Sequence, residues 1–332
     1  MFICSMANEF MLSLNETPLG CLSYTQEVMC MGSCFAQNIG ERLSYSGIQT
    51  TVNPNGIVYN SRSIWNAVHR MHRNEVYVES DLFQQNELFV SFEHHGRFSS
   101  INQEDAIRAM NAEFEEGRSA LSKPKSIFII TLGSSNVYTR HGQVVANCHK
   151  LPARDFEKRT LSIDEIESDL KGIVTALPKE ATLILTVSPV RYIKDGLIQN
   201  ARSKARLIEA SHRVVDAHQN VHYFPSYELV TDVLRDYRFF TSDRVHPTTE
   251  AINYVWKAFV ARFYDAESQN YITDVADLNR NLNHRLLHPK TKASNDFAQS
   301  VLGKCDALEQ KYGRSFAIEK KDFLLKNNIR TA

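Results

Sequence analysis

Apolar residues along the chain form short continuous runs that alternate with segments of helical periodicity. The clearest runs cover 28–31, 126–132 and 182–187, and shorter ones cover 48–53 and 221–224. A continuous apolar run between helical segments is typical of a parallel strand that helices cover on both faces. The pattern therefore predicts buried parallel strands joined by helices.

Helical periodicity fills most of the connections between these runs. A first helix is expected to start at about Cys34, and apolar side chains share one helical face in 61–72, 103–121, 162–177, 200–219, 227–237 and 248–264. Ser61 and Ser162 stand where side-chain caps are favoured. The alternation predicts an α/β fold, a flavodoxin-like three-layer α/β/α sandwich with about five parallel strands.

Two parts of the chain depart from this alternation. Period-two alternation at 88–92, with turn residues at Asn86 and Gly96, predicts an inserted β-hairpin that could form one wall of a substrate cleft. After about Ser268 the composition becomes polar and helical. We therefore expect a main α/β domain over residues 1–267 and a helical C-terminal appendage over 268–332.

Composition and charge narrow the class of protein. The 332 residues contain 38 basic and 38 acidic side chains, so no bulk charge favours nucleic acid or an anionic membrane as a partner. No apolar run approaches the roughly 18 residues of a membrane span, and the first residues lack the pattern of a secretory signal. The six cysteines show no disulfide-framework spacing, which favours the cytoplasm. No phosphate-binding or dinucleotide fingerprint is present, so no cofactor is expected.

The candidate chemistry starts at the end of the first apolar run, where Gly32 and Ser33 precede the first helix. A serine on a strand-to-helix turn lies where free backbone N–H groups and the positive end of the helix dipole converge, and both would stabilise an oxyanion. Ser33 is therefore a candidate nucleophile. The alternative is that Ser33 only caps the helix.

A second candidate segment lies far downstream, where Asp243 precedes His246 by three residues in a loop before a helix. A carboxylate at that spacing can bond Nδ1–H of the imidazole and leave Nε2 free to accept a proton from a hydroxyl. Many surface loops contain this pattern by chance. Its combination with a Gly-Ser turn after the first strand favours a Ser33, His246 and Asp243 triad.

The residues Gly32-Ser33-Cys34-Phe35-Ala36 match the five-letter signature of the GSCFA domain family, which resembles the SGNH (GDSL-like) hydrolases. The likeness continues through 53–60, 131–133, 147–150, 188–190 and 237–240. The resemblance implies Ser33 as nucleophile and first oxyanion donor, the Gly56 N–H as second donor, and Asp243 and His246 as acid and base. The turn at 53–56 alone would also explain Gly56.

The third sequence block departs from the family pattern. SGNH hydrolases usually have Gly-x-Asn, whereas here Gly133-Ser134-Ser135-Asn136 places the asparagine one residue later. Asn136 is the candidate third oxyanion donor, Asn147 could replace it, or a side-chain donor could be absent. Asn147, His149 and Lys150 are candidates for binding a carboxylate or sugar hydroxyls, and capping of neighbouring elements explains them equally well.

The sequence therefore predicts a serine esterase or acyltransferase that acts on an O-acyl ester, such as an O-acetyl ester, of a carbohydrate-like substrate. Two alternatives stay open. Cys34 could be the nucleophile, although the helix starting there should aim it toward the core. The chain could also be a non-catalytic glycan- or partner-binding module on the same fold.

Paired histidines at 94 and 95 raise the question of a metal site. No cysteine or carboxylate with ligand spacing accompanies them, so we expect no metal and interpret His94 and His95 as a solvated strand end.

Overall fold

The computed structural model describes residues 12, 14, 17–289 and 291–329. It contains the predicted five-stranded sheet, and every strand pair in it is parallel. The strand order is β10-β9-β5-β1-β2, which is the flavodoxin order. The strands are β1 (Val28–Gly32), β2 (Thr50–Val52), β5 (Ile127–Leu132), β9 (Thr182–Val187) and β10 (Val221–Phe224).

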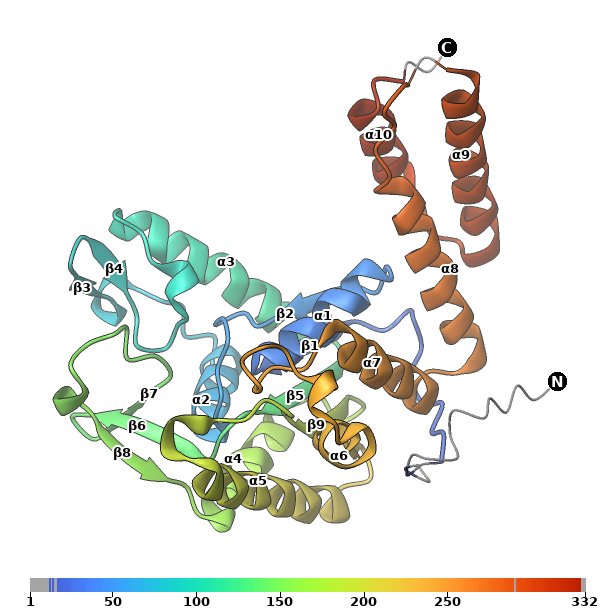
Figure 1. Cartoon of the computed structure of the whole chain (residues 1–332). Coiled ribbons are helices and arrows are strands. Elements are labelled where there is room, and N and C mark those ends of the chain that lie inside the picture. Colours follow the sequence, from blue (N-terminus) through green and yellow to red (C-terminus); the bar gives the residue numbers. More distant parts are fainter. Residues whose placement is uncertain (1–11, 13, 15–16, 290, 330–332) are drawn as a thin grey trace.

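Helices cover both faces of the sheet, as predicted (Figure 1). Along β1, Met29 and Met31 pack into one core cluster, and Val28 and Cys30 pack into the other. Helices on the first side are α2 (Ser61–His72), α3 (Gln103–Ser122), α4 (Ile163–Ala176) and α5 (Leu197–Ala217), and on the second side α1 (Cys34–Tyr45), α7 (Thr249–Phe263) and α8 (Ala266–Leu282). The three-layer architecture is therefore confirmed.

Of the two predicted serine caps, one is confirmed and one is wrong. Ser162 caps α4 and forms a capping box with Glu165. At α2 the cap is Asn60, whose side chain accepts a hydrogen bond from the backbone N–H of Ser63 at 2.8 Å. Ser61 lies one position too late to cap, and its hydroxyl donates to Asp169 at 2.8 Å instead.

Two small antiparallel sheets extend the core. The predicted hairpin is present as β3 (Phe83–Gln85) and β4 (Leu88–Val90). A second sheet has the order β7-β6-β8 and consists of β6 (Asn136–Arg140), β7 (Gln143–Val145) and β8 (Glu157–Thr160). Strand β8 was not predicted, because its four residues are all exposed and carry no apolar alternation.

The predicted continuous helix over 227–237 is wrong. The segment forms a short α6 (Ser226–Glu228) followed by a π-helix (Leu229–Leu234), and Arg235 ends it in the left-handed region at φ 42°. A left-handed residue ends a helix because it turns the backbone away from the helical path. Short 3-10 turns lie at Glu79–Asp81, Gly96–Phe98, Ala153–Asp155, Ile193–Asp195 and Tyr237–Phe239.

The C-terminal segment is helical, as predicted, and α9 (Lys292–Tyr312) and α10 (Ala317–Lys326) extend with α8 away from the α/β body (Figure 1). Tyr271 and Val275 of α8 pack in the same core cluster as α1 and α7. The division of the chain at residue 267 stays a prediction. No helix of the described residues is long and apolar enough to cross a membrane.

Candidate active site

Ser33 is placed by a close approach between the ends of β1 and β5. Gly32 adopts φ +132°, and a Cβ at this position would lie 2.1 Å from the carbonyl oxygen of Thr131. Only glycine fits there. The Gly32 N–H donates to Oδ1 of the buried Asn53 at 2.8 Å, which ties the turn to the end of β2.

Ser33 is the N-cap of α1, and its Oγ accepts a hydrogen bond from the Phe35 N–H at 3.3 Å. The capping interpretation is thus confirmed, and it does not exclude a nucleophile, because Oγ is the acceptor in this bond and its own proton stays free to transfer. The residue is 1% exposed.

The loop before α7 holds His246 through Asp243, as predicted. Asp243 Oδ2 lies 2.6 Å from His246 Nδ1, and Oδ1 accepts the backbone N–H groups of Val245 and His246 at 2.8 and 3.0 Å. These hydrogen bonds hold the pKa of Asp243 well below its usual range, and the bond from the His246 backbone N–H has the largest effect. The carboxylate is therefore ionised and orients the imidazole with Nε2 away from it.

A cavity of about 520 Å³ brings the two candidate segments together at the carboxyl edge of the sheet. Ser33 and His246 both line it. Within the described residues no hydrogen bond joins their side chains. The remaining lining comes from the start of α1, the loop between β2 and α2, the insertion that follows β4, the segments after β5 and β9, the β6–β7 sheet and the loop before α7. These residues are Cys34, Ile57, Tyr59, Asn60, His95, Gly133, Ser134, Asn136, Tyr138, Val145, Ala146, Asn147, Cys148, Ser188, Val190, Arg191, Tyr192 and Val245.

We expect Asp243→Asn to lower kcat/KM for an ester substrate by about 10²–10³. The amide cannot accept Nδ1–H as a carboxylate does and favours the wrong imidazole tautomer. The loss should be smaller than for a buried triad acid, because the Asp243 side chain is 47% exposed and water can replace part of its effect. Steady-state kinetics measure the change, and unchanged kcat/KM would contradict the pairing as a functional contact.

The two predicted backbone donors of the oxyanion hole have acceptors in the structure. The Ser33 N–H donates to the Thr131 carbonyl at 3.1 Å, and the Gly56 N–H donates to the Asn53 carbonyl at 2.6 Å. Gly56 is not among the cavity-lining residues. The role of both N–H groups stays a prediction. Cys34 offers a further donor, because the first N–H groups of a helix have no intrahelical acceptor.

Both candidate asparagines line the cavity, and they differ in what their amides bond. Asn136 Nδ2 donates to Asp195 at 3.2 Å, and its Oδ1 accepts from the Thr160 hydroxyl at 2.8 Å. Asn147 Oδ1 accepts the His149 N–H at 2.9 Å, and no acceptor among the described residues bonds its Nδ2. Asn147 is thus the asparagine with a free donor at the cavity.

Two predicted substrate-binding residues lie away from the cavity lining. His149 Nε2 lies 2.7 Å from the Ser91 carbonyl oxygen, and its ring packs edge-on against Phe83, which is the contact pattern of a structural residue. Lys150 is exposed. Their role in binding substrate stays a prediction.

Cys34 does not point into the core as the sequence analysis expected, because its side chain lines the cavity beside Ser33. Burial raises the pKa of its thiol, and the nearby Lys204 only partly offsets this. A raised pKa disfavours the thiolate, so the structure gives a cysteine nucleophile little support.

Comparison with known proteins identifies the family of the chain. The sequence matches the GSCFA family over residues 27–259, which includes every residue of the candidate triad. The chain belongs to the GSCFA family. No curated protein matches it. Among solved structures it is similar to a DUF4886 family protein from Bacteroides uniformis, with 11% identity and a TM-score of 0.37, over 76% of this chain and 93% of that one.

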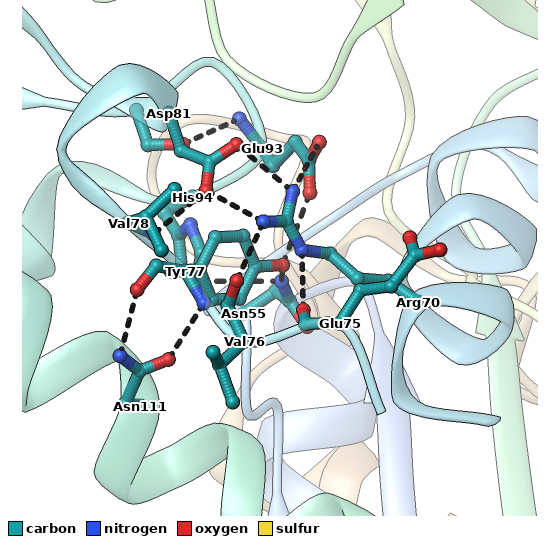
Figure 2. A network of polar contacts seen from close by, with 11 residues as sticks. Asn55, Arg70, Glu75, Val76, Tyr77, Val78, Asp81, Glu93, His94 and Asn111 are labelled. Atoms are coloured by element: carbon teal, nitrogen blue, oxygen red, sulfur yellow. Dashed lines mark hydrogen bonds and ion pairs between the residues drawn. The ribbon is translucent and has the colours of Figure 1, made fainter. Parts of the chain in front are cut away.

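In this GSCFA protein a partly buried polar network contacts the loop that carries Asn55 and Gly56 (Figure 2). Asn55 Nδ2 donates to the Tyr77 hydroxyl at 2.9 Å, and that hydroxyl donates to Glu93 at 3.0 Å. Arg70 bonds Asp81 at 2.6 Å and stacks over the Tyr77 ring. The network therefore holds the Asn55 side chain, and with it the loop that continues to Gly56, in one position.

The histidine pair completes this support, and the expectation of a solvated strand end is wrong for His94. His94 is 1% exposed, with Nε2 3.4 Å from Asn55 Nδ2. His95 is exposed, lines the cavity, and donates its backbone N–H to the Asn55 carbonyl at 2.9 Å. A Cβ on Gly56, which has φ +77°, would lie 2.2 Å from the His95 Cβ. Gly56 and His95 are therefore in close contact, and His95 lines the cavity whereas Gly56 does not.

The buried imidazole predicts a pH-dependent stability. Burial, with a smaller effect of the Arg70 charge, lowers the pKa of His94 from 6.5 to about 3. Between these values the unfolded chain binds more protons than the folded one. The free energy of unfolding is therefore expected to fall as the pH falls through this window, by up to about 1.4 kcal/mol per pH unit from this group.

Urea unfolding of His94→Gln and wild type between pH 7 and 4 measures this contribution. The variant should lose a corresponding part of the slope, and His95→Gln, which replaces the exposed neighbour, should keep it. Equal slopes for wild type and His94→Gln would show that His94 does not titrate in this way.

The sequence analysis missed several residues around the cavity. Tyr138 and Tyr192 form an aromatic wall with their hydroxyls 3.1 Å apart. The Arg191 guanidinium lies 4.3 Å from the Phe240 ring centroid and donates to the Arg244 carbonyl, bracing the Asp-x-x-His loop. Lys204 of α5 is 1% exposed.

A sequence signal for Lys204 existed. It lies at helical spacing with Leu207, Ser211 and Val214, which form the buried face of α5. A lysine on the apolar face of a helix marks a buried charge.

Among the described residues no group of three or more His, Cys, Asp or Glu side chains could hold a metal ion.

Proposed function

We propose that this GSCFA protein is a serine esterase or acyltransferase that acts on an O-acyl ester, such as an O-acetyl ester, of a carbohydrate-like substrate. One observation carries the proposal. Ser33 and His246, which are far apart in the sequence, line the same cavity, and Asp243 holds Nδ1 of that histidine at 2.6 Å. A hydroxyl, an imidazole and a carboxylate in this order are the working parts of acyl transfer through serine.

In the proposed reaction His246 Nε2 accepts the proton of the Ser33 hydroxyl as Oγ bonds to the acyl carbon. The electron pair of the carbonyl moves to its oxygen, where backbone N–H groups near the start of α1 stabilise it. The imidazolium then gives its proton to the leaving sugar oxygen as the ester bond breaks. Water, or an acceptor hydroxyl, releases the acyl group from Ser33 by the same steps.

The shape and lining of the cavity support a sugar-sized substrate. Its volume of about 520 Å³ lies within the range of small-molecule sites. Tyr59, Tyr138 and Tyr192 offer aromatic faces, and Asn147 and Arg191 offer donors to hydroxyl oxygens. We propose a substrate of this kind in the cytoplasm, with neither nucleic acid nor a membrane as partner and no cofactor.

One observation favours a second candidate, a non-catalytic glycan- or partner-binding module. The N–H groups of Ser33 and Gly56 both donate to backbone carbonyls, and an oxyanion could use them only if these bonds lengthened. A binding protein would need no such change. It would use the same aromatic and amide groups of the cavity.

Turnover separates the two candidates. The full chain is expected to hydrolyse short p-nitrophenyl esters with saturation kinetics and to release acetate from an O-acetylated oligosaccharide. A binding module would show no turnover above buffer and would bind the deacetylated oligosaccharide equally well in wild type and Ser33→Ala.

A further inference from the structure

Lys204 of α5 is a buried cation behind the cavity. It is 1% exposed, and its Nζ donates to the carbonyl oxygens of Gly133 and Ser188, both at 2.7 Å. Gly133 follows β5, Ser188 follows β9, and both line the cavity. One ammonium group therefore ties together two of the loops that form the floor of the site.

Among the described residues no carboxylate pairs with this ammonium. The ionisable groups near it are Cys34 from α1 and the ring of Tyr227 from α6, whose centroid lies 6.0 Å from Nζ. Burying a lysine without a carboxylate is costly, and here burial lowers its pKa to about 7. In its protonated form this buried amine has no carboxylate beside it in the described part of the chain, so it leaves positive potential in the cavity.

The positive charge of Lys204 influences the groups next to Ser33, the proposed nucleophile. It favours the ionised form of the Cys34 thiol, although burial dominates and raises the pKa of that thiol. Cys34 directly follows Ser33 and lines the cavity with it. The positive end of the α1 dipole lies at the same place, so the two effects add.

We propose that Lys204 is a positioning residue that fixes Gly133 and Ser188 and supplies positive charge against which negative charge develops beside Ser33. The catalytic part of this inference rests on the proposed function. Such a charge acts more strongly on the transition state than on a neutral ester, since only the transition state carries the negative oxygen.

Steady-state kinetics test the catalytic part. Lys204→Met removes the charge and both hydrogen bonds, and Lys204→Gln removes the charge but keeps an N–H donor. Each is expected to lower kcat by about 10- to 100-fold and to change KM by less than about 3-fold. Arg202→Met, which removes an exposed cation from the same helix, is the control and should keep wild-type kcat. Wild-type kcat in both Lys204 variants would overturn the proposal.

Alkylation of Cys34 tests the charge without any need for turnover. The rate of iodoacetamide modification, measured by peptide mass spectrometry at pH 6, where Lys204 with its pKa of about 7 is protonated, should fall about 3- to 10-fold in Lys204→Met and Lys204→Gln. Cys148 is the internal control, because it lines the same cavity but responds to Lys194 instead. Its rate should not change.

The two measurements separate failure of this inference from failure of the proposed function. An unchanged Cys34 rate in the folded Lys204→Gln protein overturns the inference, whether or not the wild type hydrolyses esters. A slowed Cys34 rate in a protein that shows no turnover overturns the proposed function and retains the charge effect at the cavity.

Discussion

Replacing Ser33 by alanine is expected to lower kcat for short p-nitrophenyl esters by about 10³–10⁶. The variant has no Oγ to form the acyl-enzyme, and only water attack assisted by the rest of the cavity remains. Ser33 also caps α1, so the free energy of unfolding should fall by about 0.5–2 kcal/mol. The fold should survive, because the core clusters on both faces of the sheet do not depend on this side chain.

Ser162→Ala is a matched control for this experiment. Ser162 is also a serine N-cap, since its side chain accepts the backbone N–H of Glu165, and it is not among the residues that line the cavity. We expect the control to lose a similar amount of stability and to keep wild-type kinetics. Equal turnover in Ser33→Ala and Ser162→Ala would reject Ser33 as nucleophile.

His246→Ala is expected to lower kcat by a factor similar to that of Ser33→Ala, about 10³–10⁶, because serine and its base act as one unit. Without the imidazole, Ser33 loses its proposed base. The double variant should therefore be little slower than either single variant. Steady-state kinetics of all three proteins measure this non-additivity.

His95 provides the control for the base. It lines the same cavity, is exposed, and carries the same ring. His95→Ala is expected to keep kcat within about 10-fold of wild type, because no carboxylate among the described residues holds its ring. A larger loss in His95→Ala than in His246→Ala would mean that the base has been misassigned.

Much of the fold could be predicted because the buried strands are recognisable from their own residues. A strand covered on both faces must be apolar throughout, and β5 and β9 show this in sequence as plainly as in the structure. The pairing of Asp243 with His246 could also be predicted, because it is local in sequence. The catalytic role of Ser33, His246 and Asp243 stays a prediction.

The features that could not be predicted depend on contacts between distant segments. His94 looks solvated in sequence, and it is buried because Asn55 and Tyr77 pack beside it. Asn136 matched the family pattern approximately, yet its amide bonds Asp195 and Thr160 instead of standing free. Nothing local in sequence indicates these partners.

The exposed strand β8 shows the same limit in another form. Its residues Glu157–Thr160 pair with β6 through backbone hydrogen bonds. The pattern of apolar and polar side chains does not reveal such pairing when all the side chains are exposed. Lys204 differs from these cases, because its helical spacing with the buried Leu207, Ser211 and Val214 indicates a position on the buried face of α5.

Covalent labelling by a fluorophosphonate, followed by peptide mass spectrometry, tests most directly whether Ser33 is an activated nucleophile. This reagent phosphonylates a serine hydroxyl whose proton a neighbouring base can accept. We predict one adduct in the wild-type protein, on Ser33, which is absent in Ser33→Ala and forms far more slowly in His246→Ala. A folded wild-type protein that gains no adduct on Ser33, or that is labelled at the same rate without His246, would contradict the account.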